Sequence, residues 1–228
     1  EIYTLSLHDA LPISVSDWLS ESYAEGRRRA IRDQARMPEP IDVNSGGTVY
    51  LCTADGDGNM VSFIQSNYNG FGSGIVIPGR GIALNDRGHN FSMDKASDNC
   101  LGPRKKSYHT IIPGFLTKDG KAVGPFGVMG AFMQPQGQLQ VLLNTIDYHL
   151  NPQAALDAPR WQWMGGKIIE VEPEMPQDIV YGLRLRGHDV VVKGDIQTYG
   201  RGQIIWRSEA GILMGGTEPR ADGTVAAW

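Results

Sequence analysis

The chain has few cysteines, no long apolar run and no excess of positive charge, and each of these absences excludes a class of protein. Cys52 and Cys100 are the only cysteines among 228 residues, too few for a disulfide-rich scaffold or a four-cysteine zinc site. Two free thiols are favoured over a disulfide between them. The sequence has no apolar run of about eighteen residues, as a membrane-spanning helix requires. A net charge of −4 gives no global basic field for nucleic acid.

The sequence also lacks the short motifs of several enzyme classes. It contains no HExxH, CxxC, GxSxG or P-loop pattern. The five histidines are scattered without metal-ligand spacing, so we expect neither a metal nor a cofactor. A Ser-His-Asp triad stays open, although no pattern locates one. The content of 41% hydrophobic and 20% charged residues is typical of a globular chain.

The first fourteen residues, EIYTLSLHDALPIS, have a different residue pattern from the rest of the chain. They have no basic start and an interrupted apolar stretch, unlike a secretory signal. The string resembles the translation of a sequencing adapter. We therefore expect residues 1–14 to be a sequencing scar outside the fold, with a genuine N-terminal strand as the alternative. On this interpretation the natural protein begins upstream of Val15, and the chain is a fragment.

Residues 15–36 have the apolar spacing of one helix or two short ones. Arginines at 27–29, 32 and 36 lie on the other side. In an acidic chain they favour a solvated helix face over a nucleic-acid patch. Pro38 ends the helical pattern, and residues 44–47, Asn-Ser-Gly-Gly, read as an exposed linker.

From Thr48 onward the pattern is that of an α+β protein or a layered sandwich, because strands come in hairpins, then helices follow, then strands again. The turn at residues 55–59, Asp-Gly-Asp-Gly-Asn, is a specific hairpin signal. The glycine-rich segment Gly70–Gly81 favours a close-packed turn over a phosphate cradle. We predict strands over 48–53, 61–66, 109–116, 122–128, 167–171, 190–192, 203–207 and 212–215, and helices over 136–149, 152–157 and 177–186.

Thr48 has the one mechanistic signature in the chain. It follows Gly47 at the first residue of a predicted hairpin. If the Gly47–Thr48 bond is cut, Thr48 gains a free α-amine beside its own hydroxyl. An α-amine has a pKa of about 7.7–8.0, so it can accept the hydroxyl proton near neutral pH. The alternative is an ordinary threonine at a strand edge.

Several short motifs follow one another in a characteristic order between Thr48 and Trp228. They lie at 48–55, 57–62, 71–76, 118–121, 144–148, 158–160 and 216–223. With these motifs, the region resembles the small subunit of the γ-glutamyltransferase family of N-terminal-nucleophile (Ntn) hydrolases. The resemblance implies a four-layer αββα sandwich and cleavage of a precursor between Gly47 and Thr48. Residues 15–47 would then be the tail of the large subunit with its cleavage linker, and residues 48–228 the small subunit.

Four residues of the family's catalytic machinery have counterparts here. The resemblance implies that Thr48 is the nucleophile and, through its amine, the base. Ser66 stands where a family threonine contacts the amino end of the nucleophile. Gly130 and Ala131 stand where two glycines form the oxyanion hole with backbone N–H groups, and alanine keeps that donor.

The residues that would hold the γ-glutamyl group differ from the family pattern. Tyr68, Arg87 and Asn90 replace residues that grip the α-ammonium, and His109 and Thr110 replace a serine pair for the α-carboxylate. A cation at position 87 should repel an ammonium and attract a carboxylate. His109 also has a second interpretation, as a packed histidine at a strand end.

These observations favour an autoprocessed threonine amidohydrolase or acyltransferase with altered acyl specificity, similar to the oxamate amidohydrolase-like and cephalosporin-acylase-like branches of the family. A conventional γ-glutamyltransferase acting on glutathione is the first alternative. An inactive member with a structural or binding role is the second. The expected partners are the large subunit of the same precursor and a small-molecule amide, without nucleic acid. The sequence does not determine localisation. The fragment alone should be unstable and inactive, with unpaired sheet edges.

Overall fold

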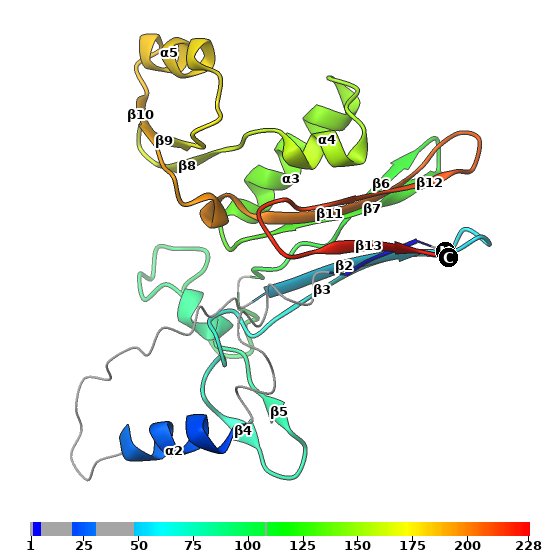
Figure 1. The fold of residues 1–228 in the computed structure, drawn as a ribbon. Coiled ribbons are helices and arrows are strands. Elements are labelled where there is room, and N and C mark those ends of the chain that lie inside the picture. The colour runs from blue at the N-terminus through cyan, green and yellow to red at the C-terminus, as the bar shows by residue number, and fades with distance from the viewer. Residues whose placement is uncertain (1, 6–19, 31–47, 108) are drawn as a thin grey trace.

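The computed structural model describes residues 2–5, 20–30, 48–107 and 109–228. Two four-stranded sheets lie face to face, and helices cover the outer face of one of them (Figure 1). The predicted α+β class is confirmed. We call the sheet with strand order β13-β1-β2-β3 the first sheet and the sheet with order β12-β11-β7-β6 the second sheet.

The first sheet is built around the predicted hairpin of β2 and β3. Its turn closes because Asn59 N donates to Asp55 Oδ1 at 2.8 Å, and Gly58 adopts a φ of +88° that suits glycine. The strands are β1 (Ile2–Leu5), β2 (Thr48–Ala54), β3 (Met60–Ser66) and β13 (Thr224–Ala227).

The strand Ile2–Leu5 corrects the expectation that residues 1–14 lie outside the fold. It pairs antiparallel with β13 on one side and with β2 on the other. Ladder hydrogen bonds come from the backbone, so an extended segment can fill this place whatever its origin. The adapter origin of residues 1–14 stays a prediction, and residues 6–19 are outside the described part of the chain.

An apolar layer joins the two sheets. Met129 and Ile205 of the second sheet pack against Tyr50, Cys52 and Ile64 of the first. Burial of these side chains is the main force that holds the sheets together. The strands of the second sheet are β6 (Gly114–Lys118), β7 (Lys121–Met129), β11 (Arg201–Arg207) and β12 (Leu213–Thr217).

Two helices cover the other face of the second sheet. They are α3 (Met133–Ile146) and α4 (Pro152–Asp157), both predicted, although α3 begins earlier than its apolar spacing indicated. Val141 of α3 and Leu156 of α4 pack on Val128 of β7. The first turn of α3 lies directly after the end of β7, which places a helix N-terminus at one end of the sandwich.

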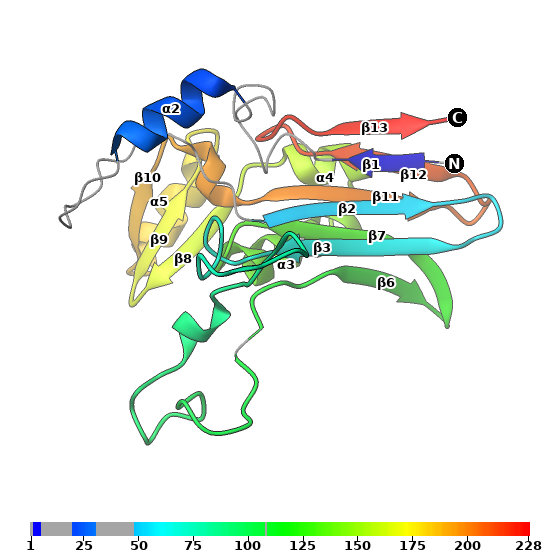
Figure 2. The same ribbon diagram turned by 90° about the horizontal axis from the view of Figure 1, so that it is seen from below.

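A smaller sheet with the order β10-β9-β8 stands beside the sandwich (Figure 2). Helix α5 (Gln177–Leu185) connects the parallel strands β9 and β10 and packs on them through Val180. The sequence predicts α5, β9 and β10 but misses β8, whose pairing is irregular between Trp163 and Gly165. The strands are β8 (Trp161–Gly165), β9 (Ile168–Val171) and β10 (Asp189–Val192).

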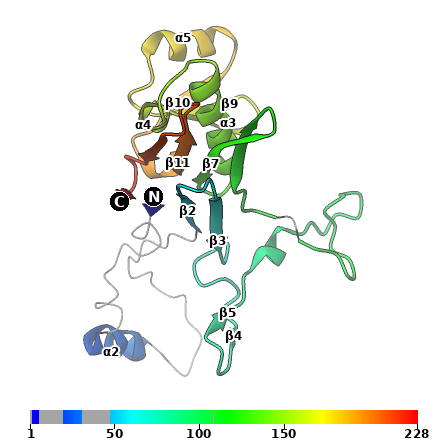
Figure 3. The same cartoon turned by 90° about the vertical axis from the view of Figure 1, so that its right-hand side faces the viewer.

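The glycine-rich segment Gly70–Gly81 forms the predicted close-packed turn only at Gly72, since Gly74, Gly79 and Gly81 have open space around them. A Cβ on Gly72 would lie 2.2 Å from the carbonyl oxygen of Leu84, so the backbone approach admits only glycine. The short hairpin that follows and the loop after residue 91 project from the sandwich (Figure 3). The remaining elements are α2 (Glu21–Ala30), β4 (Val76–Ile77), β5 (Ile82–Ala83) and the 3₁₀ turns η2 (Arg87–Asn90) and η3 (Ile196–Tyr199).

Three layers of the expected αββα sandwich are present in the described residues. The outer face of the first sheet exposes Val61 to 48% and Phe63 to 44%. Figures 1 and 2 place α2 beyond the ends of the strands rather than across that face. An apolar sheet face normally packs against another layer, and none of the described helices fills the place of the fourth layer.

Cys52 and Cys100 form no disulfide, as the composition favours. None of the helices in the described ranges is long and apolar enough to cross a membrane.

Candidate active site

Thr48 and Ser66 lie opposite each other at one end of the β2–β3 hairpin. Both are partly buried. Ser66 Oγ accepts a hydrogen bond from Tyr68 N at 2.8 Å, so its own proton can be donated elsewhere. The hairpin register therefore brings the predicted nucleophile beside its predicted partner. Gly47 lies outside the described residues.

Gly130 and Ala131 form a turn between β7 and α3 at the same end of the sandwich. Met129, the residue before this turn, packs against Tyr50, which is two residues from Thr48. Gly130 has a φ of +138° and Ala131 a φ of +51°. The left-handed conformation is uncommon for alanine and is kept only where the surroundings impose it. The positive end of a helix directly follows, which suits a site for developing negative charge.

Arg87 is buried, with 7% of its surface exposed. Its Nε donates to Thr110 Oγ1 at 2.9 Å, and its Nη2 donates to the carbonyl oxygen of Ser66 at 2.8 Å. No carboxylate among the described residues forms an ion pair with it. A buried cation held only by neutral oxygens is poorly compensated. Arg87 therefore places a positive charge beside Ser66, the residue that pairs with Thr48 in the hairpin.

Gln134 connects the Gly130–Ala131 turn to Thr110, a link that the sequence interpretation missed. It is 1% exposed. Its N–H donates to the Ala131 carbonyl oxygen at 3.1 Å. Its side-chain Nε2 donates to the Thr110 carbonyl oxygen at 2.7 Å, and its Oε1 accepts from Ile112 N at 3.0 Å.

Together these bonds run from the Gly130–Ala131 turn through Gln134, Thr110 and Arg87 to Ser66. A signal for this link exists in the sequence. Gln134 and Gln138 are four residues apart and so share a helix face. Both turn out to be buried in α3 and bonded to the 110–112 backbone.

Tyr68 and Asn90 contact each other. Tyr68 has a φ of +80°, and its hydroxyl donates to Asn90 Oδ1 at 2.9 Å. Asn90 Nδ2 is buried without a partner among the described residues. The structure therefore brings this predicted pair together beside Ser66, since Tyr68 N also bonds Ser66 Oγ.

His109 is exposed, so the interpretation as a packed strand-end histidine is wrong. Its Nδ1 lies 3.1 Å from the carbonyl oxygen of Ile111, and β6 begins only at Gly114. The strand predicted from residue 109 starts late because the 110–112 backbone bonds to glutamine side chains of α3 instead of a neighbouring strand.

Asp86, which precedes Arg87 in the sequence, does not neutralise it. Its carboxylate accepts from Asn69 N and Asn69 Nδ2, each at 3.0 Å. These hydrogen bonds lower the pKa of the Asp86 carboxyl below its ordinary value. The Asp86 carboxylate thus binds Asn69 and does not pair with Arg87.

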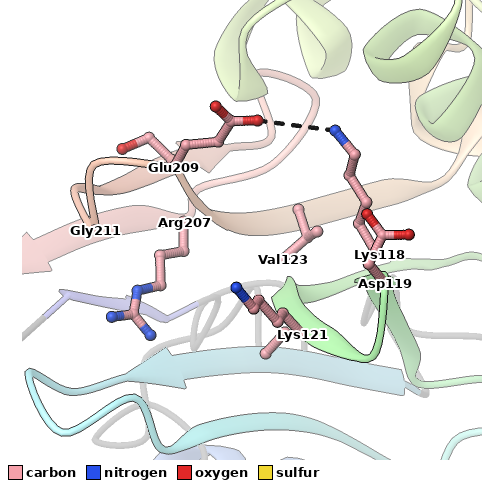
Figure 4. A pocket seen from close by; sticks show the side chains of 9 residues that line it. Lys118, Asp119, Lys121, Val123, Arg207, Glu209 and Gly211 are labelled. Carbon is pink, nitrogen blue, oxygen red and sulfur yellow. Dashed lines mark ion pairs between the residues drawn. The ribbon is translucent and has the colours of Figure 1, made fainter.

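Other places in the described residues offer less chemistry. No group of three or more His, Cys, Asp or Glu side chains there could hold a metal ion. A hollow of about 690 Å³ lies at the far end of the sandwich from Thr48 (Figure 4). The β6–β7 turn and the β11–β12 turn line it. It contains the Lys118–Glu209 ion pair at 3.8 Å and none of the predicted site residues.

Comparison with known proteins identifies the family. The family profile described as Gamma-glutamyltranspeptidase matches residues 5–228. The chain belongs to the gamma-glutamyltranspeptidase family. The glutathione hydrolase-like YwrD proenzyme of Bacillus subtilis (strain 168) is 40% identical over 211 residues, which cover 90% of this chain and 40% of that protein.

Two further proteins are similar to the chain. The oxamate amidohydrolase proenzyme of Klebsiella pneumoniae is 32% identical over 224 residues, covering 96% of this chain and 42% of that protein. The crystal structure of cephalosporin acylase from Bacillus halodurans superposes with a TM-score of 0.76 at 61% identity, covering 98% of this chain and 41% of that one. The chain spans about two fifths of the length of the curated relatives it matches.

Proposed function

We propose that this chain carries the catalytic part of an autoprocessed threonine amidohydrolase that forms an acyl-Thr48 intermediate. The observation that supports this most is the placement of Thr48 opposite Ser66, with a continuous set of hydrogen bonds from Ser66 to the Gly130–Ala131 turn. The relatives named above are proenzymes, which supports processing before Thr48.

The reaction follows from these groups. Cleavage between Gly47 and Thr48 frees the Thr48 α-amine, which takes the proton of Thr48 Oγ. The oxygen attacks the amide carbonyl carbon, and the N–H groups of Gly130 and Ala131 stabilise the negative oxygen. The C–N bond then breaks, and the leaving amine takes the proton from the α-amine. Water attacks the acyl-Thr48 ester, releases a carboxylic acid and restores the threonine hydroxyl. An amine acceptor in place of water gives a new amide.

The acyl group that fits this site carries a carboxylate. Arg87 supplies a cation that no carboxylate of the described residues pairs with, whereas Tyr68, Asn90, His109 and Thr110 supply no negative charge for an ammonium group. Oxamate is itself an amide whose acyl part carries a carboxylate, and a relative named for it is 32% identical. A glutaryl group, which is γ-glutamyl without its ammonium, is therefore the better model substrate.

A conventional glutathione hydrolase is the second candidate, since one relative carries the name glutathione hydrolase-like. Matched assays with glutaryl p-nitroanilide and γ-glutamyl p-nitroanilide separate the two. A higher kcat/KM on the glutaryl compound supports the proposed specificity, and the reverse order supports the glutathione hydrolase.

The remaining part of the precursor is the proposed partner. The chain spans two fifths of its curated relatives, and the bare face of the first sheet exposes Val61 and Phe63. A large subunit from the same precursor would bring the fourth, helical layer to that face. These two apolar side chains suit such packing.

The test of the catalytic proposal is the intact mass of the full-length gene product beside its Thr48→Ala variant. We expect two fragments split between Gly47 and Thr48 in the wild type and one uncut, inactive chain in the variant. A Thr48→Ser variant is the matched control, because it keeps both the amine and a hydroxyl and should still be processed. An uncut wild-type chain would contradict the catalytic role and support a structural or binding one.

A further inference from the structure

Arg160 is a buried arginine that contacts none of the proposed site residues. It lies between α4 and β8 with 1% of its surface exposed. Its Nη1 donates to the carbonyl oxygens of Tyr199 at 3.1 Å and Gly200 at 2.9 Å. Its Nη2 donates to Glu218 Oε2 at 2.7 Å. One guanidinium thus fixes two successive carbonyl groups at the start of β11.

Gly200 in turn lies directly behind Gly130. A Cβ on Gly130 would be 2.9 Å from Gly200 Cα. A Cβ on Gly200 would be 3.0 Å from the Met129 carbonyl oxygen and 2.7 Å from Val128 Cγ1. The two backbones therefore touch without intervening side chains. A shift of Gly200 by a few tenths of an ångström must be transmitted to the Gly130–Ala131 turn.

Glu218 holds the same segment from its other end. Its Oε2 accepts from Gly202 N at 2.8 Å as well as from Arg160. The side chains of the Arg160–Glu218 ion pair are 1% and 0% exposed. The pair therefore bonds the backbone on both sides of residue 201, at Gly200 O and at Gly202 N. Because both groups are buried and mutually bonded, their geometry is tightly constrained.

We infer that Arg160 is a positioning residue for the oxyanion hole, acting through Gly200 on Gly130. The inference rests on the proposed function, since it needs Gly130 and Ala131 to serve as donors to the tetrahedral intermediate. Oxyanion donors stabilise the transition state only when they are held at the place where the charge develops. Arg160 supplies that constraint from behind the turn, without touching the substrate.

Arg220 provides a matched comparison. It belongs to the same buried cluster and bonds Glu172 and Glu218, but its carbonyl partners are Leu156 and Ala158. It therefore shares the structural role of Arg160 without the contact to Gly200. Arg160→Lys and Arg220→Lys both keep a charge and lose a planar fork of donors.

The experiment compares these two variants in the processed full-length enzyme, with glutaryl p-nitroanilide as substrate. It measures kcat, KM, the melting temperature and the inhibition constant of 4-boronobutanoate, a tetrahedral mimic of the acyl intermediate. For Arg160→Lys we expect kcat to fall by about 10- to 100-fold with KM within about twofold. The binding of 4-boronobutanoate should weaken by a factor similar to the fall in kcat. For Arg220→Lys we expect a similar loss of melting temperature and near wild-type kcat.

Equal losses of kcat in the two variants, or a wild-type kcat in Arg160→Lys, would overturn the inference. If Arg160→Lys does not fold, Gly200→Ala decides the question, because its new Cβ would press on Val128 Cγ1 and the Met129 carbonyl oxygen while Arg160 and Glu218 are both kept. We expect the same loss of kcat and boronate affinity there, and wild-type values would count against the role. Loss of activity in Thr48→Ala establishes the proposed function separately, so these results bear on Arg160 alone.

Discussion

Arg87 and Arg160 are both buried, but their surroundings differ. Arg160 is surrounded by carbonyl oxygens and the Glu218 carboxylate. Burial lowers the pKa of the Arg160 guanidinium and Glu218 opposes that effect. The Glu218 carboxylate balances the charge of Arg160, although Arg160 Nε has no hydrogen-bond partner among the described residues. Arg87 meets two neutral oxygens and no carboxylate of the described residues. A buried cation paired with a carboxylate serves the structure, whereas an unpaired one beside a nucleophile is suited to an anionic ligand.

The largest expected effect comes from removing the counter-ion of Arg160, the paired arginine. Glu218→Ala leaves Arg160, Arg220 and Gly202 N without their shared acceptor. Breaking a buried pair in this way typically costs about 3–5 kcal/mol, measured as the loss in unfolding free energy by urea denaturation of the full-length protein. Glu209→Ala is the control, since its pair with Lys118 is exposed and should contribute at most about 1 kcal/mol. Equal losses would show that burial of the Glu218 cluster has no special weight.

An intermediate effect is expected from removing the unbalanced arginine. Arg87→Met should lower kcat/KM on glutaryl p-nitroanilide by about 10- to 100-fold, because a charge-assisted hydrogen bond contributes about 1.5–3 kcal/mol. The same change should raise the relative rate on γ-glutamyl p-nitroanilide, whose ammonium group the cation repels. An unchanged ratio of the two rates would contradict the proposed role of Arg87, and Arg184→Met is an exposed arginine control.

The smallest effect is expected at Asp86, the carboxylate nearest to Arg87 in the sequence. Asp86→Asn should leave KM for glutaryl p-nitroanilide within about twofold, because this carboxylate bonds Asn69 rather than Arg87. A large change in KM would make Asp86 the counter-ion and end the contrast between the two arginines.

The pH dependence of stability provides a second measurement on Asp86. Its pKa is lowered in the folded state by hydrogen bonds from Asn69. The stabilisation is therefore complete above the ordinary carboxyl pKa of about 3.9 and is lost as pH falls through the lower folded value. Denaturation curves from pH 6 to pH 2 should show this loss in the wild type and a smaller one in Asp86→Asn.

The hairpins and helices were largely predictable because their signals are local. Asp55 and Gly58 specify the β2–β3 turn, and that turn sets the register that brings Thr48 opposite Ser66. The β13 strand was missed because its partner β1 lies at the other end of the chain. The β8 strand was missed although its partner β9 follows directly, because their pairing is irregular between Trp163 and Gly165. Residue 109 was assigned to a strand wrongly, because glutamines of α3 take the backbone bonds of residues 110–112.

The candidate site was partly predictable. The sequence pointed to Thr48 through the preceding glycine pair, and the family resemblance pointed to Ser66, Gly130 and Ala131. It did not indicate that Gln134 bridges the turn to Thr110. The spacing of Gln134 and Gln138 places both on one helix face, but their bonds form only once the backbone of residues 110–112 lies against that face.

The sequence by itself determined the hairpin, its register and the chemistry available at residue 48, because these depend on neighbouring residues and on side-chain type. The tertiary structure alone decided that Ser66, Arg87, Thr110 and Gln134 meet, since their bonds join residues 21 to 24 positions apart. It also decided that Arg160 reaches Gly200, 40 residues away. Such contacts exist only after the sheets and α3 have packed, because packing places the donors and excludes water from them.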